Sequence, residues 1–128
     1  MTLRVDTGVD VVDIDRFALS LRRTPSLRER LFTEAEREAA GRSVASLAAR
    51  FAAKEAAMKA LGVGLGSVGF HDISVAREAS GAPRLELSGR AAGLARERGW
   101  LSHSLSLSHS RIVAVAVVVA QARELARG

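Results

Sequence analysis

The stretch ARFAAKEAAMKALGVG, residues 49–64, carries the strongest structural signal in this chain. Apolar residues recur near helical spacing in and around it, namely Leu47, Phe51, Met58 and Leu61. Gly62 follows them at the place where a left-handed C-cap is expected. The pattern therefore predicts one long helix over 46–61, followed by a flexible, glycine-rich loop over 62–69.

The segment before this helix predicts one strand and two short helices. β-Branched residues indicate a strand over 5–12. A short helix is expected over 13–23, and Pro25 prevents it from continuing. Thr33 and Glu36 have the spacing of a capping box. A second short helix is therefore expected to begin at Thr33, and we expect it to be exposed.

The segment after the glycine-rich loop combines strands with one further helix. The patterns predict strands over 70–76, 84–88, 103–109 and 112–120, and a polar-faced helix over 89–99. Only a few residues separate the last two strands, so they are expected to pair antiparallel. The last strand is apolar on both faces, so it should be central or covered by a partner. We expect a single α+β domain over 1–128, with a mostly antiparallel sheet packed with one long helix and several short helices.

Composition limits the class of protein. The 128 residues include no cysteine, which excludes disulfides, thiolate zinc sites and thiol nucleophiles and fits a reducing cytosol. The longest apolar run, IVAVAVVVA, is about half as long as a membrane helix requires. We therefore expect a cytoplasmic protein with no membrane partner. The net charge of +5 favours an anionic partner, which could be a nucleic acid, an acidic protein or a phosphorylated small molecule.

Two of the three histidines lie in SHSLSLSHS, residues 102–110. On a strand, Ser108 and His109 point to opposite faces, which excludes an adjacent nucleophile and base. His103 and His109 would be about 20 Å apart on a straight strand, too far to share one metal ion. A half-exposed strand with its serines on the wet face is the plain interpretation of this stretch.

Two carboxylates occur within otherwise apolar stretches, Asp10 in GVDVV and Glu55 in AAKEAA. Such a placement is costly unless the charge is paired or binds a metal, and Mg²⁺ takes one or two protein carboxylates. A strand-end cap by Asp10 and an ion pair of Glu55 with Lys59 are the alternatives. Lys54 and Lys59 are the only lysines, and a compact ammonium suits phosphate. The alternative to a phosphate-binding role is that the two lysines occur there by chance in a chain that otherwise uses arginine.

Five segments, in this order, resemble the holo-(acyl-carrier-protein) synthase family, the small trimeric class of 4'-phosphopantetheinyl transferases. They are GVDVVDIDRF, ARFAAKEAAMKALGVG, FHDISV, SGAPRLELSG, and SLSHS before a valine- and alanine-rich strand. The resemblance covers nearly the whole chain. It implies the 4'-phosphopantetheinyl transferase fold and Mg²⁺-dependent transfer of phosphopantetheine from coenzyme A to a serine of an apo acyl carrier protein. The released product would be 3',5'-ADP. Fatty acid or lipid biosynthesis is the expected pathway, and the sequence leaves open a carrier of polyketide or peptide assembly.

The resemblance also implies roles for individual residues. Asp10 and Glu55 match the magnesium ligands, and the residues expected to be catalytic are Glu55, Lys59 and His109. The residues expected to bind coenzyme A are Arg50, Phe51, Lys54, Lys59, Gly62, Gly64, Pro83, Ser108 and His109. The residues expected to receive the acidic helix of the carrier protein are Arg16, Arg22, Arg23, Arg28 and Arg30.

The resemblance further implies a homotrimer with active sites between subunits, in which the apolar last strand faces neighbouring chains. One position departs from the family pattern, because Ser110 stands where an acidic residue is expected after the histidine. The general base is therefore unassigned, and activity could be slower. The rival hypothesis is a non-catalytic module that docks carrier proteins or binds nucleic acid. Few aromatics and scattered arginines count against nucleic acid as a partner.

Overall fold

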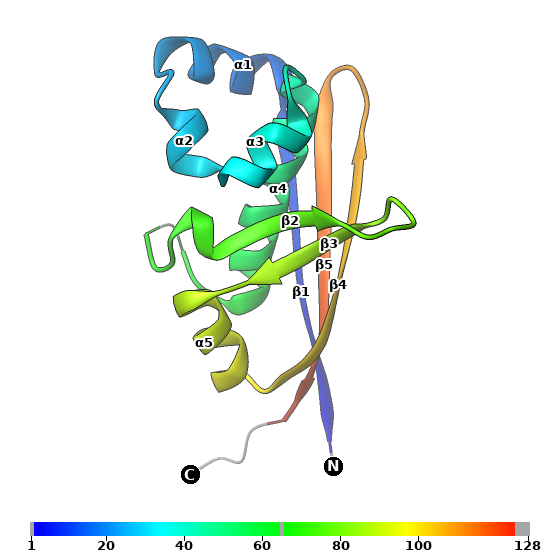
Figure 1. Ribbon diagram of the computed structural model, residues 1–128. Helices are drawn as coiled ribbons and strands as arrows, with labels where there is room; N and C mark the ends of the chain where they lie inside the picture. The colour runs from blue at the N-terminus through cyan, green and yellow to red at the C-terminus, as the bar shows by residue number, and fades with distance from the viewer. Residues whose placement is uncertain (1, 65, 125–128) are drawn as a thin grey trace.

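The computed structural model describes residues 2–64 and 66–124 (Figure 1). In chain order, the elements are β1 (Leu3–Asp13), α1 (Ile14–Arg23), α2 (Leu27–Leu31), α3 (Glu34–Ala40), α4 (Val44–Leu61), the 3₁₀ turn η1 (Phe70–Asp72), β2 (Ile73–Arg77), β3 (Pro83–Leu87), α5 (Gly89–Glu97), β4 (Trp100–His109) and β5 (Val113–Arg123). The predicted α+β class is confirmed. None of the described helices has the length and apolar composition needed to cross a bilayer.

The larger sheet has the strand order β1–β5–β4, and both pairings are antiparallel. The apolar β5 is therefore central, as its sequence predicted. One row across the sheet joins Asp10 of β1, Ala116 of β5 and Leu107 of β4. Alternate residues along each strand face α4, and the others form an outer face that no described element covers. The two ends of the row, Asp10 on β1 and Leu107 on β4, border different pockets.

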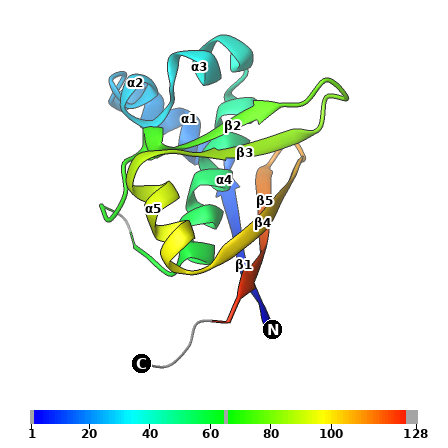
Figure 2. The same ribbon diagram turned by 60° about the horizontal axis from the view of Figure 1, so that its bottom comes forward.

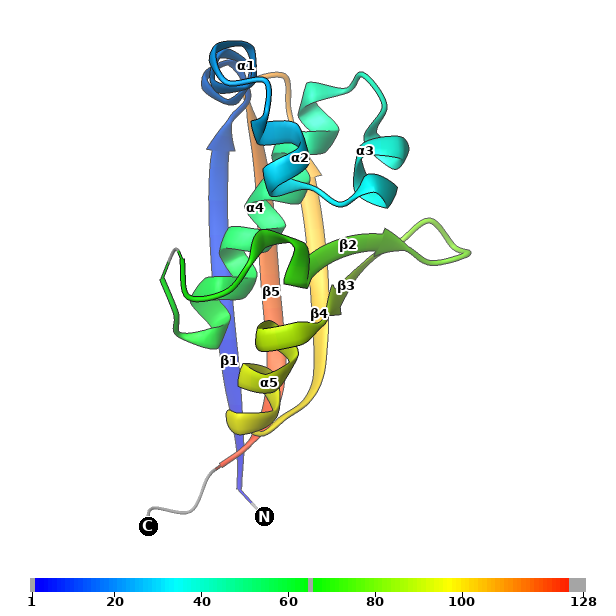
Figure 3. The ribbon, with the colours of Figure 1, turned by 60° about the vertical axis from the view of Figure 1, so that its left-hand side comes forward.

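Helix α4 packs on the inner face of this sheet through alanines (Figure 3). Its fully buried alanines are Ala48, Ala52, Ala53, Ala56 and Ala57. The contact with β1 is so close that a Cβ added to Gly8 would lie 1.8 Å from the carbonyl oxygen of Ala56. Small side chains on both elements therefore bring the helix backbone directly onto the strand.

The ends of α4 follow local sequence rules. Ser43 is the N-cap, and its hydroxyl accepts a hydrogen bond from the Ser46 amide at 3.1 Å, so the helix begins two residues earlier than predicted. Gly62 adopts a left-handed conformation with φ of 74°, as predicted for the C-cap.

The remaining elements cover the side of α4 that faces away from the sheet (Figures 1 and 2). The β2–β3 hairpin crosses the helix, α5 lies near the chain termini, and α1 to α3 gather at the other end. The long helix is therefore the centre of the core, with the sheet on one side and the hairpin on the other.

Two predictions about this covering layer were wrong in detail. Helix α3 has the predicted capping box, but Glu36 is only 1% exposed, so the helix is not simply a surface element. The predicted strand over 70–76 begins with the η1 turn, and β2 starts at Ile73. The short helix α2 was not predicted, because five residues after a proline carry too little periodicity to indicate a helix.

Candidate active site

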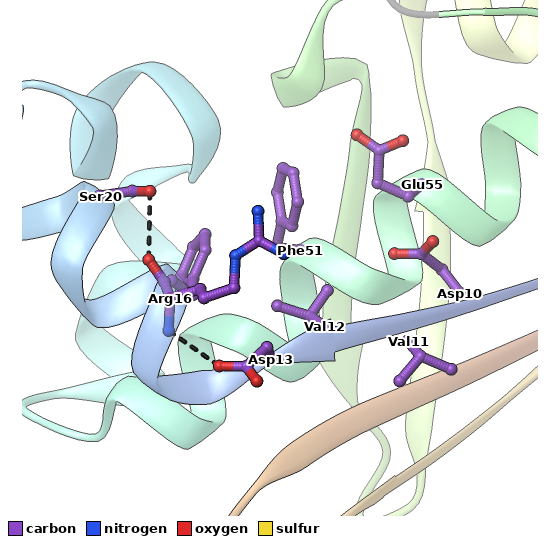
Figure 4. Close-up of a pocket in the computed structure, with 9 residues that line it drawn as sticks. Asp10, Val11, Val12, Asp13, Arg16, Ser20, Phe51 and Glu55 are labelled. Atoms are coloured by element: carbon purple, nitrogen blue, oxygen red, sulfur yellow. Dashed lines mark hydrogen bonds between the residues drawn. The ribbon is translucent and has the colours of Figure 1, made fainter.

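The first cavity, called the carboxylate pocket below, lies where β1 passes into α1 beside α4 (Figure 4). Its volume is about 330 Å³. The lining residues are Asp10, Val11, Val12, Asp13, Arg16, Phe17, Ser20, Phe51 and Glu55. Asp10 comes from β1 and Glu55 from the middle of α4, so the structure brings both predicted magnesium ligands to one cavity.

Lys59 contacts Asp10 beside this pocket, although it is not one of the lining residues. Its Nζ donates to Asp10 Oδ1 at 3.1 Å and to the carbonyl oxygen of Val9 at 2.9 Å. Lys59 therefore pairs with Asp10, and the alternative of a Glu55–Lys59 ion pair within the helix is not among the salt bridges of the described residues. The alternative of a strand-end cap by Asp10 does not hold either. Asp13 has this role, since its carboxylate accepts from the amide of Arg16 and caps α1.

The electrostatics at Glu55 favour a bound cation. Burial and, after it, the nearby negative charge of Asp10 raise the pKa of the Glu55 carboxyl, and Lys59 only partly opposes this rise. A divalent cation beside both carboxylates would remove that repulsion. No cluster of three or more potential metal-binding side chains occurs among the described residues. A two-carboxylate site fits Mg²⁺, which usually keeps waters and substrate phosphate oxygens as its other ligands.

A second cavity, called the basic pocket below, lies between α4, the β2–β3 hairpin and the end of β4. Its volume is about 220 Å³, and its lining residues are Ser46, Ala49, Arg50, Arg77, Pro83, Leu107, Ser108 and His109. Four predicted coenzyme A residues, Arg50, Pro83, Ser108 and His109, therefore meet here. Two arginines and an exposed histidine give the cavity the chemistry of a phosphate site.

Arg50 is buried, with an exposed fraction of 2%. Its Nη1 donates to the carbonyl and hydroxyl oxygens of Ser46 one turn earlier, and its Nε has no hydrogen-bond partner among the described residues. Burial, and then the positive charge of Arg77, lower the pKa of Arg50, while Glu36 acts in the opposite direction. The guanidinium therefore has hydrogen-bonding capacity that its own chain does not use.

Lys54 lies apart from both pockets, inside the core, with no exposed side-chain area. Its Nζ donates to Glu36 Oε1 at 2.7 Å and to the carbonyl oxygens of Phe70 and Ile73. These contacts use all three hydrogens of an ammonium group. Lys54 was predicted to contact coenzyme A. In the structure, its three ammonium hydrogens are already bound by acceptors of its own chain, so the placement differs from that prediction.

The other predicted coenzyme A residues are dispersed. Phe51 lines the carboxylate pocket, where its ring stacks with Phe17 at a centroid distance of 5.2 Å. Gly62 and Gly64 line neither pocket. The carboxylate pocket and the basic pocket lie at opposite edges of the sheet, with α4 between them.

The stretch SHSLSLSHS forms β4 and the turn after it. Leu105 and Leu107 pack toward the core and the serines are exposed, as the alternation predicted. His103 is half-buried and its Nε2 lies 3.1 Å from the carbonyl oxygen of Leu85, while His109 borders the basic pocket. The hydroxyl of Ser110 accepts from the amides of Ile112 and Val113, so this residue shapes the β4–β5 turn.

The five arginines predicted to receive a carrier protein lie on α1 and α2 (Figure 1). Arg16, Arg22, Arg23 and Arg30 are exposed and Arg28 is half-buried. Arg16 also borders the carboxylate pocket, where Figure 4 shows its side chain beside Phe51. The basic surface and the carboxylate pair therefore adjoin one another.

Sequence reasoning missed Arg77 in the basic pocket. This residue ends β2 and is paired with Pro83 of β3, which was predicted to border the coenzyme A site. The hairpin signal in SVAREASGAPRL contained the information, because pairing the two strands places Arg77 opposite Pro83.

Comparisons with known proteins show the family of this chain. The model of the 4'-phosphopantetheinyl transferase superfamily matches residues 6–116. A holo-(acyl-carrier-protein) synthase of Moorella thermoacetica is 48% identical over 120 residues, covering 91% of this chain and 94% of the relative. A synthase of the same name from Kocuria rhizophila is 51% identical over 123 residues, covering 96% and 97% of the two chains.

Solved structures agree with these sequence matches. A complex of the synthase with coenzyme A, attributed to Chronobacterium ammoniagenes, is 32% identical with a TM-score of 0.85, covering 94% of this chain and 99% of the other. The Helicobacter pylori holo-(acyl-carrier-protein) synthase in complex with coenzyme A is 34% identical with a TM-score of 0.81, covering 89% and 98%. This chain therefore belongs to the 4'-phosphopantetheinyl transferase superfamily and, within it, to the holo-(acyl-carrier-protein) synthases.

Proposed function

We propose that this chain transfers 4'-phosphopantetheine from coenzyme A to a serine of an apo acyl carrier protein and releases 3',5'-ADP. The observation that carries the proposal is the Asp10–Glu55 carboxylate pair in a cavity beside a basic surface, in a chain of this family. The structural relatives that were solved with coenzyme A support the choice of donor.

Asp10 and Glu55 would hold Mg²⁺ between β1 and α4. When bound, the ion would polarise the transferred phosphoryl group and offset the charge of the leaving group. Lys59 is placed to leave Asp10 and donate to a phosphate oxygen, because its side chain is 55% exposed and its contact with Asp10 is a surface ion pair. Arg50 and His109 would bind phosphate in the basic pocket.

Proton removal from the carrier serine needs a base, and Ser110 supplies no carboxylate. Its hydroxyl is already occupied by two amides of the turn. We therefore assign this step to Glu55 or to a water in the carboxylate pocket.

The carrier protein would dock on α1 and α2. The exposed arginines there would attract an acidic helix and place its serine near Arg16, at the mouth of the carboxylate pocket. This attraction should raise the association rate and weaken with salt. An expected outcome is that Arg22→Ala together with Arg23→Ala raises the KM for the carrier and leaves the KM for coenzyme A unchanged.

We further propose that the complete site forms between copies of this chain in a homotrimer. Helix α4 separates the carboxylate pocket from the basic pocket of the same chain. A single ligand would therefore contact the carboxylate pocket of one chain and the basic pocket of another more easily than both pockets of one chain. The outer face of the sheet carries exposed valines on β1 and β5, including Val5, Val9, Val11, Val117 and Val119. Such a face is suited to burial against further copies.

The transferase proposal is tested by incubating the protein with coenzyme A, Mg²⁺ and a panel of apo carrier proteins. Mass spectrometry should show each accepted carrier heavier by one phosphopantetheine group, and Glu55→Gln should give far less of this product in the same reaction time. The absence of an adduct with every carrier, combined with tight, salt-sensitive binding of RNA or DNA, would instead support the binding-module hypothesis.

The shared site is tested by complementation. Asp10→Asn damages only the carboxylate pocket and Arg50→Met only the basic pocket, so each variant alone should be nearly inactive. When the two are unfolded, mixed and refolded together, mixed trimers would contain some intact sites and regain activity. Light scattering should give the mass of three chains. A monomer mass, or no gain on mixing, would contradict the shared site.

A further inference from the structure

A third cavity lies behind the basic pocket and shares Arg50 and Arg77 with it. This rear cavity has a volume of about 270 Å³ and is also lined by Thr33, Ser74 and Glu36. Arg50 therefore lies between two spaces. The basic pocket is open to a ligand phosphate, and the rear cavity is lined by two carboxylates of the same chain. These are the buried Glu36 and the exposed Glu86, which pairs with Arg84.

The Glu36 carboxylate is held by other partners in the structure. Its Oε1 accepts from Lys54 Nζ at 2.7 Å and from the Thr33 amide at 3.0 Å. Its Oε2 accepts from the Val75 amide at 3.1 Å. Glu36 is 1% exposed and Lys54 is fully buried, so bulk water screens this ion pair little.

Arg50 gains no such partner. It lies one helical turn before Lys54 on α4, lines the same cavity as Glu36, and has a buried Nε without a hydrogen-bond partner among the described residues. A buried guanidinium normally pairs with a carboxylate. Without Lys54, the Glu36 carboxylate would be the natural partner for Arg50 across the rear cavity.

We propose that Lys54 is a positioning residue, which holds Glu36 away from Arg50 and so keeps the Arg50 guanidinium free to bind a ligand phosphate in the basic pocket. The inference rests on the proposed function, since it assumes that a phosphate of coenzyme A occupies this pocket. It also gives a reason for a lysine at this position. The ammonium reaches Glu36 and two carbonyl oxygens at once, a convergent geometry that the planar fork of arginine does not match.

The central test is Lys54→Met, which removes the charge and keeps the length of the side chain. Glu36 should then pair with Arg50, and calorimetry should show coenzyme A affinity falling by about tenfold or more. The Arg50 Nε–Hε signal in NMR spectra of the ligand-free protein should shift relative to wild type. In the double variant Glu36→Gln/Lys54→Met, affinity should return to nearly the wild-type value, because the Glu36 carboxylate is gone and Glu86, the other carboxylate of this cavity, pairs with Arg84.

The single variant Glu36→Gln provides a second test that does not depend on how well Lys54→Met folds. It leaves Arg50 free, so coenzyme A affinity should be equal to or higher than that of wild type even if the protein melts earlier. Met58→Ala is the matched control, since it weakens the core one turn after Lys54 without changing a charge. It should lower the melting temperature and leave the affinity unchanged.

Unchanged affinity and an unshifted Arg50 signal in folded Lys54→Met would overturn the inference. So would weaker binding by Glu36→Gln, or a double variant as weak as Lys54→Met, because a purely architectural ion pair predicts both. Failure of the wild-type protein to bind coenzyme A would count against the proposed function. In that case the Arg50 signal of Lys54→Met still decides whether Lys54 holds Glu36 away from Arg50.

Discussion

Asp6 and Asp10 lie on the same face of β1, four residues apart, and they have opposite surroundings. Asp6 is 7% exposed and accepts hydrogen bonds from Arg4, Arg98 and Trp100. Asp10 has one cationic partner, Lys59, whose side chain is 55% exposed. A carboxylate whose acceptor sites are filled by its own fold stabilises that fold. A carboxylate with an exchangeable partner is able to bind a ligand.

The pKa values show the same division. Hydrogen bonds from Arg4 act most strongly on Asp6, ahead of the opposing effect of burial and the further bonds from Arg98 and Trp100, and they hold its pKa far below the usual range. Beside Asp10, burial and then the Asp10 charge itself raise the pKa of Glu55. The fold therefore stabilises a negative charge at one end of β1 and leaves negative charge only partly compensated at the other.

The largest effect is expected from Gly8→Ala, since Gly8 lies between the two aspartates on the same face. The added Cβ would collide with the Ala56 carbonyl oxygen, so β1 must separate from α4. We expect a loss of about 3 kcal/mol or more in the free energy of unfolding. The surroundings of both Asp6 and Asp10 should be disrupted. Urea unfolding followed by circular dichroism measures this loss. Gly64→Ala, at a site with open space around it, should differ little from wild type.

The next largest effect concerns the Asp10 end alone. Glu55→Gln and Asp10→Asn should each lower kcat by about 10²–10³-fold, because each removes half of the carboxylate pair. Neither change should lower the free energy of unfolding by much, since the pair repels in the absence of a cation. Steady-state kinetics and urea unfolding together check the prediction. Glu38→Gln, at an exposed position of α3, is the control. A large loss of stability in Glu55→Gln would contradict the distinction drawn between Asp6 and Asp10.

A smaller effect, confined to stability, is expected at the other end. Asp6→Asn should cost about 1–2 kcal/mol near neutral pH, because the bonds from Arg4 and Arg98 lose their charged acceptor. The folded-state pKa of Asp6 is depressed, so its contribution is present above the unfolded value near 3.9 and is lost as pH falls toward the folded value. Unfolding curves of the two proteins should therefore converge in acid. An equal difference in the free energy of unfolding between wild type and Asp6→Asn at pH 7 and at pH 2 would contradict this prediction.

The smallest stability effect is expected from Lys59→Met. An exposed ion pair contributes roughly 0.5 kcal/mol or less, so the free energy of unfolding should change little. The activity should nevertheless fall, because Lys59 is the cation nearest to Asp10. Thermal melting alongside kinetic assays checks the contrast with Asp6→Asn, and a stability loss as large as that of Asp6→Asn would remove the distinction between the two aspartates.

Much of this arrangement could be predicted from local patterns. The period of α4, the cap at Gly62, the capping box at Thr33 and the central position of β5 all follow from spacing and composition. The meeting of Asp10 with Glu55 was expected from the family resemblance. These features depend either on neighbouring residues or on the motifs that carry the family resemblance.

The burial of Lys54 and Glu36 could not be predicted, because a charged residue in an amphipathic sequence normally faces water. Their pairing joins residues 18 apart and depends on how α3 and β2 pack around α4. The separation of the two pockets by α4 was equally hidden, since a motif gives residue types without the face of the helix on which each one lies. Tertiary packing decided these points.

The alanine contact between α4 and β1 also has a mechanical consequence. Where large side chains separate two elements, thermal motion of those side chains changes their spacing. Here backbone meets backbone at Gly8 and Ala56, so the distance between the Asp10 and Glu55 backbones is governed by atomic contact with almost no compliance. The proposed Mg²⁺ site would gain from such rigidity, because this ion demands strict bond lengths. Any redesign for a larger cation would have to lift the helix itself off the strand.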